Sequence, residues 1–169
     1  WIAHGSNLFF LDYKAQKSKR VYSESEFGFT CYTPLFESRD KSIWYGSATK
    51  FIHFKSSNSE PEIFVLPYKF NSLHETPYIN AIVENGDYMW LATVAGVFGL
   101  HKSTHAWITF TPIPGDNNSI SPYRVYALLP DPFYPEKYLW AGLNGGGICR
   151  LDLNTFEIKK FTTKDGLPN

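Results

Sequence analysis

Residues 139–161 read LWAGLNGGGICRLDLNTFEIKKF, and this stretch decides the fold. Two short apolar runs, at 139–143 and 148–151, are separated by a glycine-rich turn, and a third run that ends in an aromatic residue closes the stretch. Glycine supplies the positive φ of a tight reversal without steric penalty. The stretch therefore predicts successive antiparallel β-strands with a glycine turn between the first two.

The same pattern occurs four times along the chain. Segments that begin at Trp1, Trp44, Trp90 and Trp140 share a tryptophan, a turn of small residues and a second apolar run. The tryptophans are 43, 46 and 50 residues apart, and the second run follows the tryptophan by seven residues in three copies and by eight in the fourth. A period of about 40–50 residues is typical of β-propeller blades, each a four-stranded sheet. We therefore expect an all-β propeller of about four consecutive blades.

Each complete repeat is predicted to contain four strands, named A to D outward from the propeller axis. Strand A is the apolar run before the tryptophan, at 30–37, 78–84 and 123–129. Strand B carries the tryptophan, at 43–47, 88–93 and 138–143. Strand C follows the turn, at 51–55, 97–101 and 148–152, and strand D is the aromatic run at 63–68, 107–111 and 156–161. No apolar stripe with a 3.6-residue period is sustained, so we expect almost no helix.

These strands give a partial blade over 1–29, which begins at strand B, and complete blades over 30–76, 77–121 and 122–169. Propellers typically close with about four to eight blades and so avoid free sheet edges. Three blades and three further strands would leave apolar sheet faces open. We therefore expect this chain to be an open fragment of a larger propeller.

Composition excludes several classes of protein. The chain of 169 residues is 43% hydrophobic and 18% aromatic, which excludes a disordered segment. Its formal net charge is zero, so nothing indicates a nucleic-acid partner, and no run approaches the about 18–20 apolar residues of a membrane span. We expect no nucleic-acid partner and no direct membrane contact. Cys31 and Cys149 are expected to be buried free thiols.

Local motifs that could carry chemistry have simpler structural interpretations. The glycines at 145–147 lack the following helix that a phosphate-binding loop requires. His101 and His105 fall on a strand end and a turn, where positions i and i+4 do not share a face. Zinc needs three or more ligands, so we expect no metal site and no cofactor. Trp44, Trp90 and Trp140 are expected to pack between blades rather than to stack on a sugar.

The C-terminal repeat resembles the two-component regulator propeller repeat, whose pattern runs V-x-x-I-x-E-D-x-x-G-x-L-W-I-G-T-x-x-G-L-x-R-F-D, then F-x-x-Y and G-L-P-N. The matching residues are Val125, Leu128, Asp131, Leu139, Trp140, Gly142, Arg150, Asp152, Phe161 and 166–169. The preceding repeat matches at Ile79, Ile82, Glu84, Met89, Trp90, Ala92, Thr93, Gly96, Val97 and Leu100. The chain departs from the pattern at an insertion, PDPFYPEKY at 130–138, and at the long stretch 64–76.

This resemblance implies a periplasmic sensor region of a hybrid two-component histidine kinase. It implies ligand sensing and signal transmission to the rest of the receptor chain, often with an oligosaccharide as the ligand and a homodimer as the working unit. The fragment itself is then noncatalytic. Two alternatives remain open: a propeller lyase or glycosidase, which needs converging carboxylates or histidines, and a protein-interaction scaffold, which needs an exposed apolar patch.

Loops at one end of the blades are the predicted location of a binding site. B–C turns and D–A connections open on one face of a propeller, and binding residues are commonly carried on loops over a rigid scaffold. The candidate ligand-binding residues on or beside these loops are His4, Lys50, His74, Tyr78, Tyr123, Arg124 and Asn144. Asn7, Asn118 and Tyr32 are further candidates on the same grounds.

Overall fold

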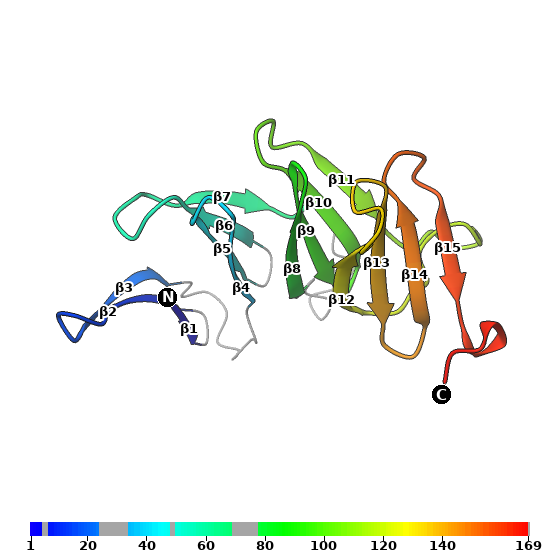
Figure 1. Cartoon of the computed structure of the whole chain (residues 1–169), viewed down its shortest axis with the longest axis horizontal. Helices are drawn as coiled ribbons and strands as arrows, with labels where there is room; N and C mark the ends of the chain where they lie inside the picture. The colour runs from blue at the N-terminus through cyan, green and yellow to red at the C-terminus, as the bar shows by residue number, and fades with distance from the viewer. Residues whose placement is uncertain (5–6, 24–33, 48–49, 69–77, 169) are drawn as a thin grey trace. The chain divides into compact units, whose positions relative to one another are not determined.

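The chain is all-β, as the sequence predicts. A computed structural model describes every residue except 5–6, 24–33, 48–49, 69–77 and 169. It divides into two compact units, Trp1–Leu66 and Pro67–Asn169, each built from two antiparallel sheets. Within the described residues the one helical element is a 3₁₀ turn, η1 (Thr163–Asp165). Figure 1 shows the strands in chain order.

The first unit holds a three-stranded and a four-stranded sheet. The three-stranded sheet has the order β1-β2-β3, with β1 Ile2–His4, β2 Asn7–Asp12 and β3 Lys17–Ser23. The four-stranded sheet has the order β4-β5-β6-β7, with β4 Leu35–Glu37, β5 Ile43–Gly46, β6 Lys50–Phe54 and β7 Glu62–Val65. The core of the first unit contains buried apolar residues of both sheets, namely Leu8, Ile43, Tyr45, Ile52 and Phe54.

The second unit holds two complete four-stranded sheets. One has β8 Ile79–Asn85, β9 Tyr88–Thr93, β10 Gly96–His101 and β11 Trp107–Phe110, hydrogen-bonded in chain order. The other has β12 Val125–Pro130, β13 Tyr138–Leu143, β14 Gly147–Asp152 and β15 Ile158–Phe161, again in chain order. Up-and-down sheets of this kind are the blades that the 43–50-residue spacing predicts.

One face of each sheet in the second unit contributes side chains to a shared hydrophobic core. Trp90, Ala92 and Val97 contribute from the β8–β11 sheet, and all three are buried. The β12–β15 sheet contributes alternate residues of β13 and β14, namely Leu139, Ala141, Leu143, Cys149 and Leu151. Because side chains alternate along a strand, the residues between them lie on the other face. Cys149 is a buried free thiol, as predicted, whereas Cys31 lies outside the described residues.

The tryptophans of the repeat do not all have the same surroundings. Trp44 and Trp90 are buried, as expected for packing residues. Trp140 is only half-buried, because it lies on the face of β13 opposite Leu139 and Ala141. Its indole Nε1 donates a hydrogen bond to Asp131 Oδ2 at 2.8 Å. The expectation of burial between blades is therefore not met by Trp140 within this chain.

Several predicted strand bounds are wrong by one to three residues, and at β15 the reason is a side-chain cap. The predicted strand at 156–161 begins only at Ile158, because Phe156 has φ 61° and belongs to the turn. The residue at the end of strand C, Asp152, accepts hydrogen bonds from the backbone N–H groups of Asn154 and Thr155 at 2.9 and 3.0 Å. This side-chain cap holds the chain in a turn where apolar pattern alone predicts a strand.

The same turn occurs in two other sheets. Asp12 Oδ1 accepts from the N–H groups of Lys14 and Ala15, both at 3.0 Å. His101 Nδ1 accepts from Ser103 and Thr104, both at 3.2 Å. In all three turns the fourth residue after the cap has positive φ: Gln16, His105 and Phe156. The aspartate of the repeat pattern is therefore a turn cap, and His101 replaces it as an acceptor.

Candidate functional site

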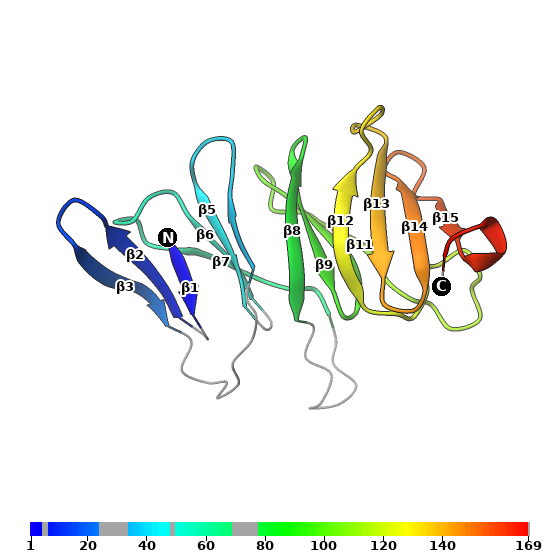
Figure 2. The same ribbon diagram turned by 60° about the horizontal axis from the view of Figure 1, so that its bottom comes forward.

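One end of the second unit, called the loop end, carries the β11–β12 connection and the β9–β10 and β13–β14 turns, as the propeller prediction requires. Figure 2 shows the β13–β14 turn and the entry to β12 at the same end of the sheets. Val94 N–H donates to the Tyr78 carbonyl at 3.3 Å, and Asn144 N–H donates to the Arg124 carbonyl at 2.9 Å. These matching bonds make Tyr78 and Arg124 equivalent positions at the entries to β8 and β12.

Tyr123 has a different role from Tyr78, although both were predicted to begin inner strands. Its ring lies against the glycine turn: a Cβ placed on Gly146 would come within 2.5 Å of Tyr123 Cδ2. Tyr123 is nevertheless 46% exposed, so its ring is supported on one side and open on the other. Arg124 and Asn144 beside it are exposed. The turn therefore takes its positive φ, 76° in each case, from Gly145 and Gly147, while Gly146 leaves room for the Tyr123 ring.

Two of the predicted ligand-binding residues lie elsewhere. His4 ends β1 and is exposed, and Lys50 begins β6 and is half-buried, both in the first unit. His74 lies outside the described residues, as does Tyr32. The structure therefore brings Tyr78, Tyr123, Arg124 and Asn144 to one end of the second unit, and their assignment to a ligand stays a prediction.

A recess of about 400 Å³ opens in the β11–β12 connection, beside β15. Ser119 shapes it, because its hydroxyl accepts from the Ile113 N–H at 2.9 Å and donates to the Asp116 carbonyl at 2.9 Å. Lys160 Nζ donates to the Asn117 carbonyl at 2.9 Å and so ties the loop to β15. The lining residues are Pro112, Ile113, Pro114, Gly115, Asp116, Asn117, Ser119, Ile120, Pro122 and Lys160.

The recess has the composition of a small-ligand site. Proline and isoleucine walls offer apolar surface, while Asp116 and Lys160 offer charged groups, and sites for small ligands commonly have about 300–1,000 Å³ with a few convergent polar groups. The sequence prediction named Asn118, its neighbour, but missed the recess itself. The signal was present in the run TPIPGDNNSISP at 111–122, which is rich in proline, glycine and asparagine.

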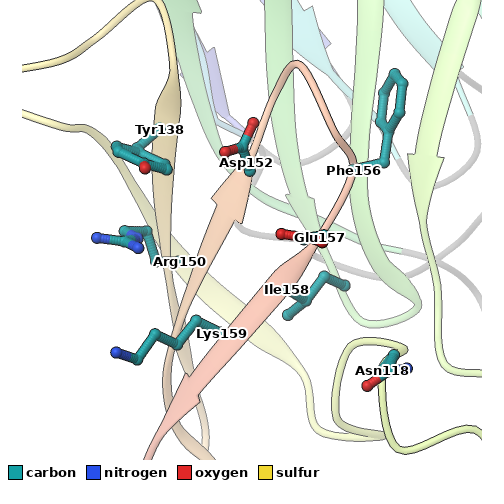
Figure 3. A pocket seen from close by; sticks show the side chains of 8 residues that line it. All are labelled: Asn118, Tyr138, Arg150, Asp152, Phe156, Glu157, Ile158 and Lys159. Atoms are coloured by element: carbon teal, nitrogen blue, oxygen red, sulfur yellow. The ribbon is translucent and has the colours of Figure 1, made fainter.

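A second recess of about 430 Å³ surrounds the edge strand β15. In Figure 3, Tyr138, Arg150 and Lys159 project to one side of the strand, whereas Phe156 and Ile158 project to the other. The Arg150 guanidinium lies 4.0 Å from the centre of the Tyr138 ring, a cation–π contact. The β11–β12 recess is the better candidate, because proline and isoleucine side chains form its walls, as is common for sites that bind small ligands.

Two carboxylates of the β12–β15 sheet act as hydrogen-bond acceptors. Backbone N–H groups of Thr155 and Asn154 lower the pKa of Asp152, and the Trp140 indole N–H, followed by the backbone of Phe133 and Tyr134, lowers that of Asp131. A general acid needs the opposite shift. Among the described residues, no group of three or more histidines, cysteines, aspartates or glutamates could hold a metal ion.

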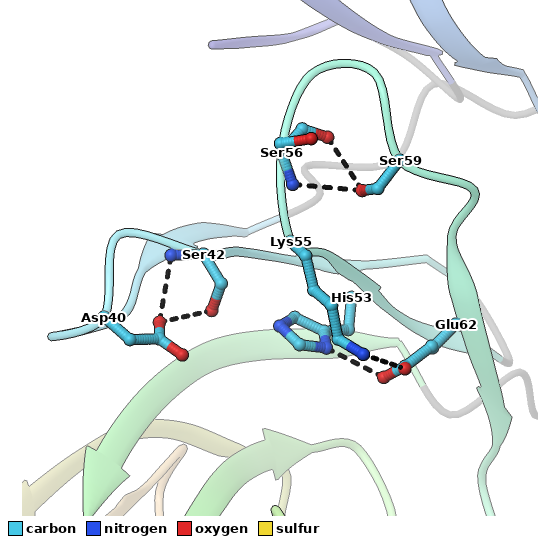
Figure 4. A network of polar contacts seen from close by, with 7 residues as sticks. All are labelled: Asp40, Ser42, His53, Lys55, Ser56, Ser59 and Glu62. Carbon is cyan, nitrogen blue, oxygen red and sulfur yellow. Dashed lines mark hydrogen bonds and ion pairs between the residues drawn. The ribbon is translucent and has the colours of Figure 1, made fainter.

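Among the carboxylates that the structure describes, Glu62 of the first unit has the most strongly shifted pKa (Figure 4). Lys55 Nζ at 2.8 Å and His53 Nδ1 at 3.0 Å lower its pKa to about 2. The imidazole of His53 is stacked on Trp44, with ring centres 4.0 Å apart and planes 10° apart. A carboxylate of such low pKa stays ionised and orients its partners, so this network stabilises the sheet.

Comparison with known proteins gives structural neighbours only. No family model matches the chain, and no curated protein matches it. One solved structure, the extracellular domain of BT3049 from B. thetaiotaomicron, described as a hybrid two-component system, has a TM-score of 0.66 at 17% identity, over 82% of this chain and 19% of that one. The corresponding domain of BT4673 has a TM-score of 0.67 at 16% identity, over 92% and 19%.

A third neighbour has a different description. PorZ, a bacterial surface component of the type-IX secretion system of Porphyromonas gingivalis, has a TM-score of 0.63 at 15% identity, over 95% of this chain and 25% of that one. The chain thus spans about a fifth to a quarter of the length of these neighbours. Such likeness establishes the fold. None of the described helical residues forms a segment able to cross a bilayer.

Proposed function

We propose that this chain is part of the ligand-sensing propeller of a two-component signalling receptor, that it lies in the periplasm, and that it recognises a glycan-derived oligosaccharide. The observation that carries the proposal is the loop end of the second unit. There a braced Tyr123 ring and the exposed Arg124 and Asn144 occur together with a separate recess that presents Lys160. The repeat pattern at 139–169 and the extracellular two-component neighbours support the receptor assignment.

The chemistry of these side chains suits a sugar. An aromatic face braced by the backbone packs against the apolar face of a pyranose at low entropic cost, and the tyrosine hydroxyl both donates and accepts hydrogen bonds. The Asn144 amide offers further donors and an acceptor. Arg124 and Lys160 add two positive charges, which favour a sugar with a carboxylate or sulfate group. Binding here is noncatalytic and needs no cofactor.

In this proposal the bound sugar is sensed through the sheets and the signal passes to the rest of the receptor chain, with a homodimer as the working unit. Ligand binding at a loop end changes an output only if the ligand prefers one of two conformations of the receptor. Asn80 Nδ2 donates to the Val125 carbonyl at 2.7 Å, which joins the β8 and β12 sheets near this end. A ligand that alters the spacing of these sheets would therefore act on both.

A surface scaffold for protein partners is the second candidate function, because PorZ is described as a surface component of a secretion system. A propeller lyase or glycosidase is a third. The lowered pKa values of Asp131 and Asp152 count against an acid role for either carboxylate. The scaffold predicts no response to any sugar, and the enzyme predicts that the sugar is consumed.

The test uses the whole extracytoplasmic part of the receptor that contains these residues. Its unfolding temperature is measured against a panel of neutral, uronic-acid and sulfated oligosaccharides of two to eight sugars. A ligand raises the unfolding temperature because it binds only the folded state. Lys160→Ala and Tyr123→Ala should lose the shift, whereas Lys164→Ala, an exposed lysine of η1, should keep it. No shift with any sugar, or cleavage of the sugar, contradicts the proposal.

A further inference from the structure

The insertion at 130–138 forms a fixed loop that presents two aromatic rings to solvent. It joins β12 to β13 at the end of the sheets opposite the glycine turn, and in Figure 2 it projects beyond the ends of both strands. Phe133 is 84% exposed and Tyr134 65% exposed. We call the segment 131–138 the aromatic tip. The corresponding connection between β8 and β9 is only two residues long.

Hydrogen bonds within the loop hold the aromatic tip in one conformation. Asp131 Oδ1 accepts from the N–H groups of Phe133 and Tyr134 at 2.9 and 3.0 Å, and Asp131 Oδ2 accepts from Trp140 Nε1. The Tyr134 carbonyl accepts from the N–H groups of Lys137 and Tyr138 at 3.0 and 2.9 Å. Prolines at 130, 132 and 135 restrict the backbone further. The rings are therefore exposed on an ordered support.

The aromatic tip is also attached to the neighbouring sheet. Asn85 Nδ2, at the end of β8, donates to the Pro135 carbonyl at 2.7 Å. Asn80, near the start of the same strand, makes the matching bond to Val125 at the loop end. The strand β8 is thus joined to the β12 sheet at both ends. A change in the spacing of the two sheets at the loop end would therefore change the position of the aromatic tip.

Exposed rings on an ordered support are the usual anchors of protein contacts. Phenylalanine and tyrosine bury large areas, and preordering removes most of the entropic cost of binding. Two rings offer about 300–500 Å², well below the about 800 Å² per partner of a stable complex between separate molecules. Such a contact is sufficient within one polypeptide, because tethering raises the effective concentration of the partner surface.

We propose that the aromatic tip inserts Phe133 and Tyr134 into an apolar pocket elsewhere in the same receptor polypeptide, as the output contact of the two sheets. This inference rests on the proposed function, since it requires a longer receptor of which this chain is one part. Solved neighbours are four to five times longer than the stretch that matches, since the match covers 19–25% of those chains. The tip and the candidate ligand site lie at opposite ends of the same sheets (Figure 2).

The test measures side-chain accessibility in the full-length wild-type receptor by hydroxyl-radical oxidation and mass spectrometry. Tyr13 is the control for Tyr134, because it has the same chemistry and is 86% exposed at the β2–β3 turn. Each oxidation rate is normalised to the same residue in the urea-unfolded receptor. We expect Tyr134 to be slowed about fivefold or more, because a ring inserted in a pocket loses most of its exposed area. The same loss is expected for Phe133.

The outcomes show whether the aromatic tip binds its own receptor chain, and they separate this contact from the sensing function. Protection that persists on dilution supports the proposal. Protection that disappears on dilution identifies a second receptor molecule as the occupant and overturns the proposal. A Tyr134 oxidation rate close to that of the unfolded receptor also overturns the proposal. Sugar binding without tip protection leaves the proposed function standing and removes only this inference. Tip protection in a receptor that no sugar stabilises supports the contact and removes the sensing function.

Discussion

The ring of Trp90 lies directly on the backbone of Gly99, its partner across strands β9 and β10. A Cβ added to Gly99 would lie 2.6 Å from Trp90 Cζ3. The same register pairs Trp44 with His53 and Trp140 with Arg150. The residue paired with the tryptophan is therefore a glycine in one sheet, a histidine in the second and an arginine in the third. The side chain at this position decides how the tryptophan is covered.

Gly99→Ala should destabilise the second unit by about 1–3 kcal/mol, because the methyl group must displace a fully packed indole. Gly142→Ala is the matched control in a neighbouring sheet, where the nearest atom to an added Cβ lies at an ordinary 3.6 Å. Urea unfolding followed by circular dichroism measures both. Equal effects of the two substitutions would show that the packing of Trp90 does not depend on a glycine at position 99.

Glu62 gives the first unit a defined response to acid. Its folded-state pKa is about 2 against an ordinary value of 4.5, so its contribution to stability is present above about pH 4.5 and is lost as the pH falls toward about 2. Glu62→Gln should lose stability at neutral pH and flatten the dependence of the unfolding temperature in this range. Glu60→Gln, which changes an exposed glutamate just before β7, is the control. An unchanged profile for Glu62→Gln would contradict the assignment.

His101 should be replaceable by aspartate but not by alanine. Its Nδ1 accepts two backbone hydrogen bonds, so the ring proton lies on Nε2, and Asp12 and Asp152 do the same work in other turns. His101→Ala should cost about 0.5–1.5 kcal/mol through the lost acceptor. His101→Asp should recover most of it. Denaturant midpoints at pH 7.5 make the comparison, and equal losses for both variants would exclude the capping role.

Asp131 should control the order of the aromatic tip. Asp131→Ala removes the acceptor of the Phe133 and Tyr134 N–H groups, so exchange of these amides with solvent deuterium should accelerate about tenfold or more, since each loses its hydrogen bond. Asp116→Ala, which caps one amide in the β11–β12 connection, serves as the control for a general loss of stability. Unchanged exchange at 133 and 134 would mean that the prolines alone order the loop.

The fold could be predicted from sequence because its signals are local and repeated. Tryptophan spacing, small-residue turns and alternating strands recur in each blade, and B-strand 88–93 and 138–143 agree with β9 and β13. The errors occur where one side chain overrides an apolar run. Asp152 keeps Phe156 in a turn, and a turn in which the Tyr123 N–H donates to the Ser121 carbonyl at 2.8 Å precedes β12, which begins only at Val125. A pattern of apolar residues does not reveal which polar neighbour captures the backbone.

The candidate site was only partly predictable. The sequence alone determined the turns and connections of a repeated sheet, on which it predicts the binding residues, because turn chemistry and strand period are properties of neighbours in the chain. Only the tertiary structure decided that Gly146 seats Tyr123, that Lys160 closes a recess with Asn117, and that Asn85 holds the aromatic tip. These contacts join residues 23 to 50 positions apart. Which side chains meet at such distances depends on how two sheets pack, and packing is a property of the folded chain.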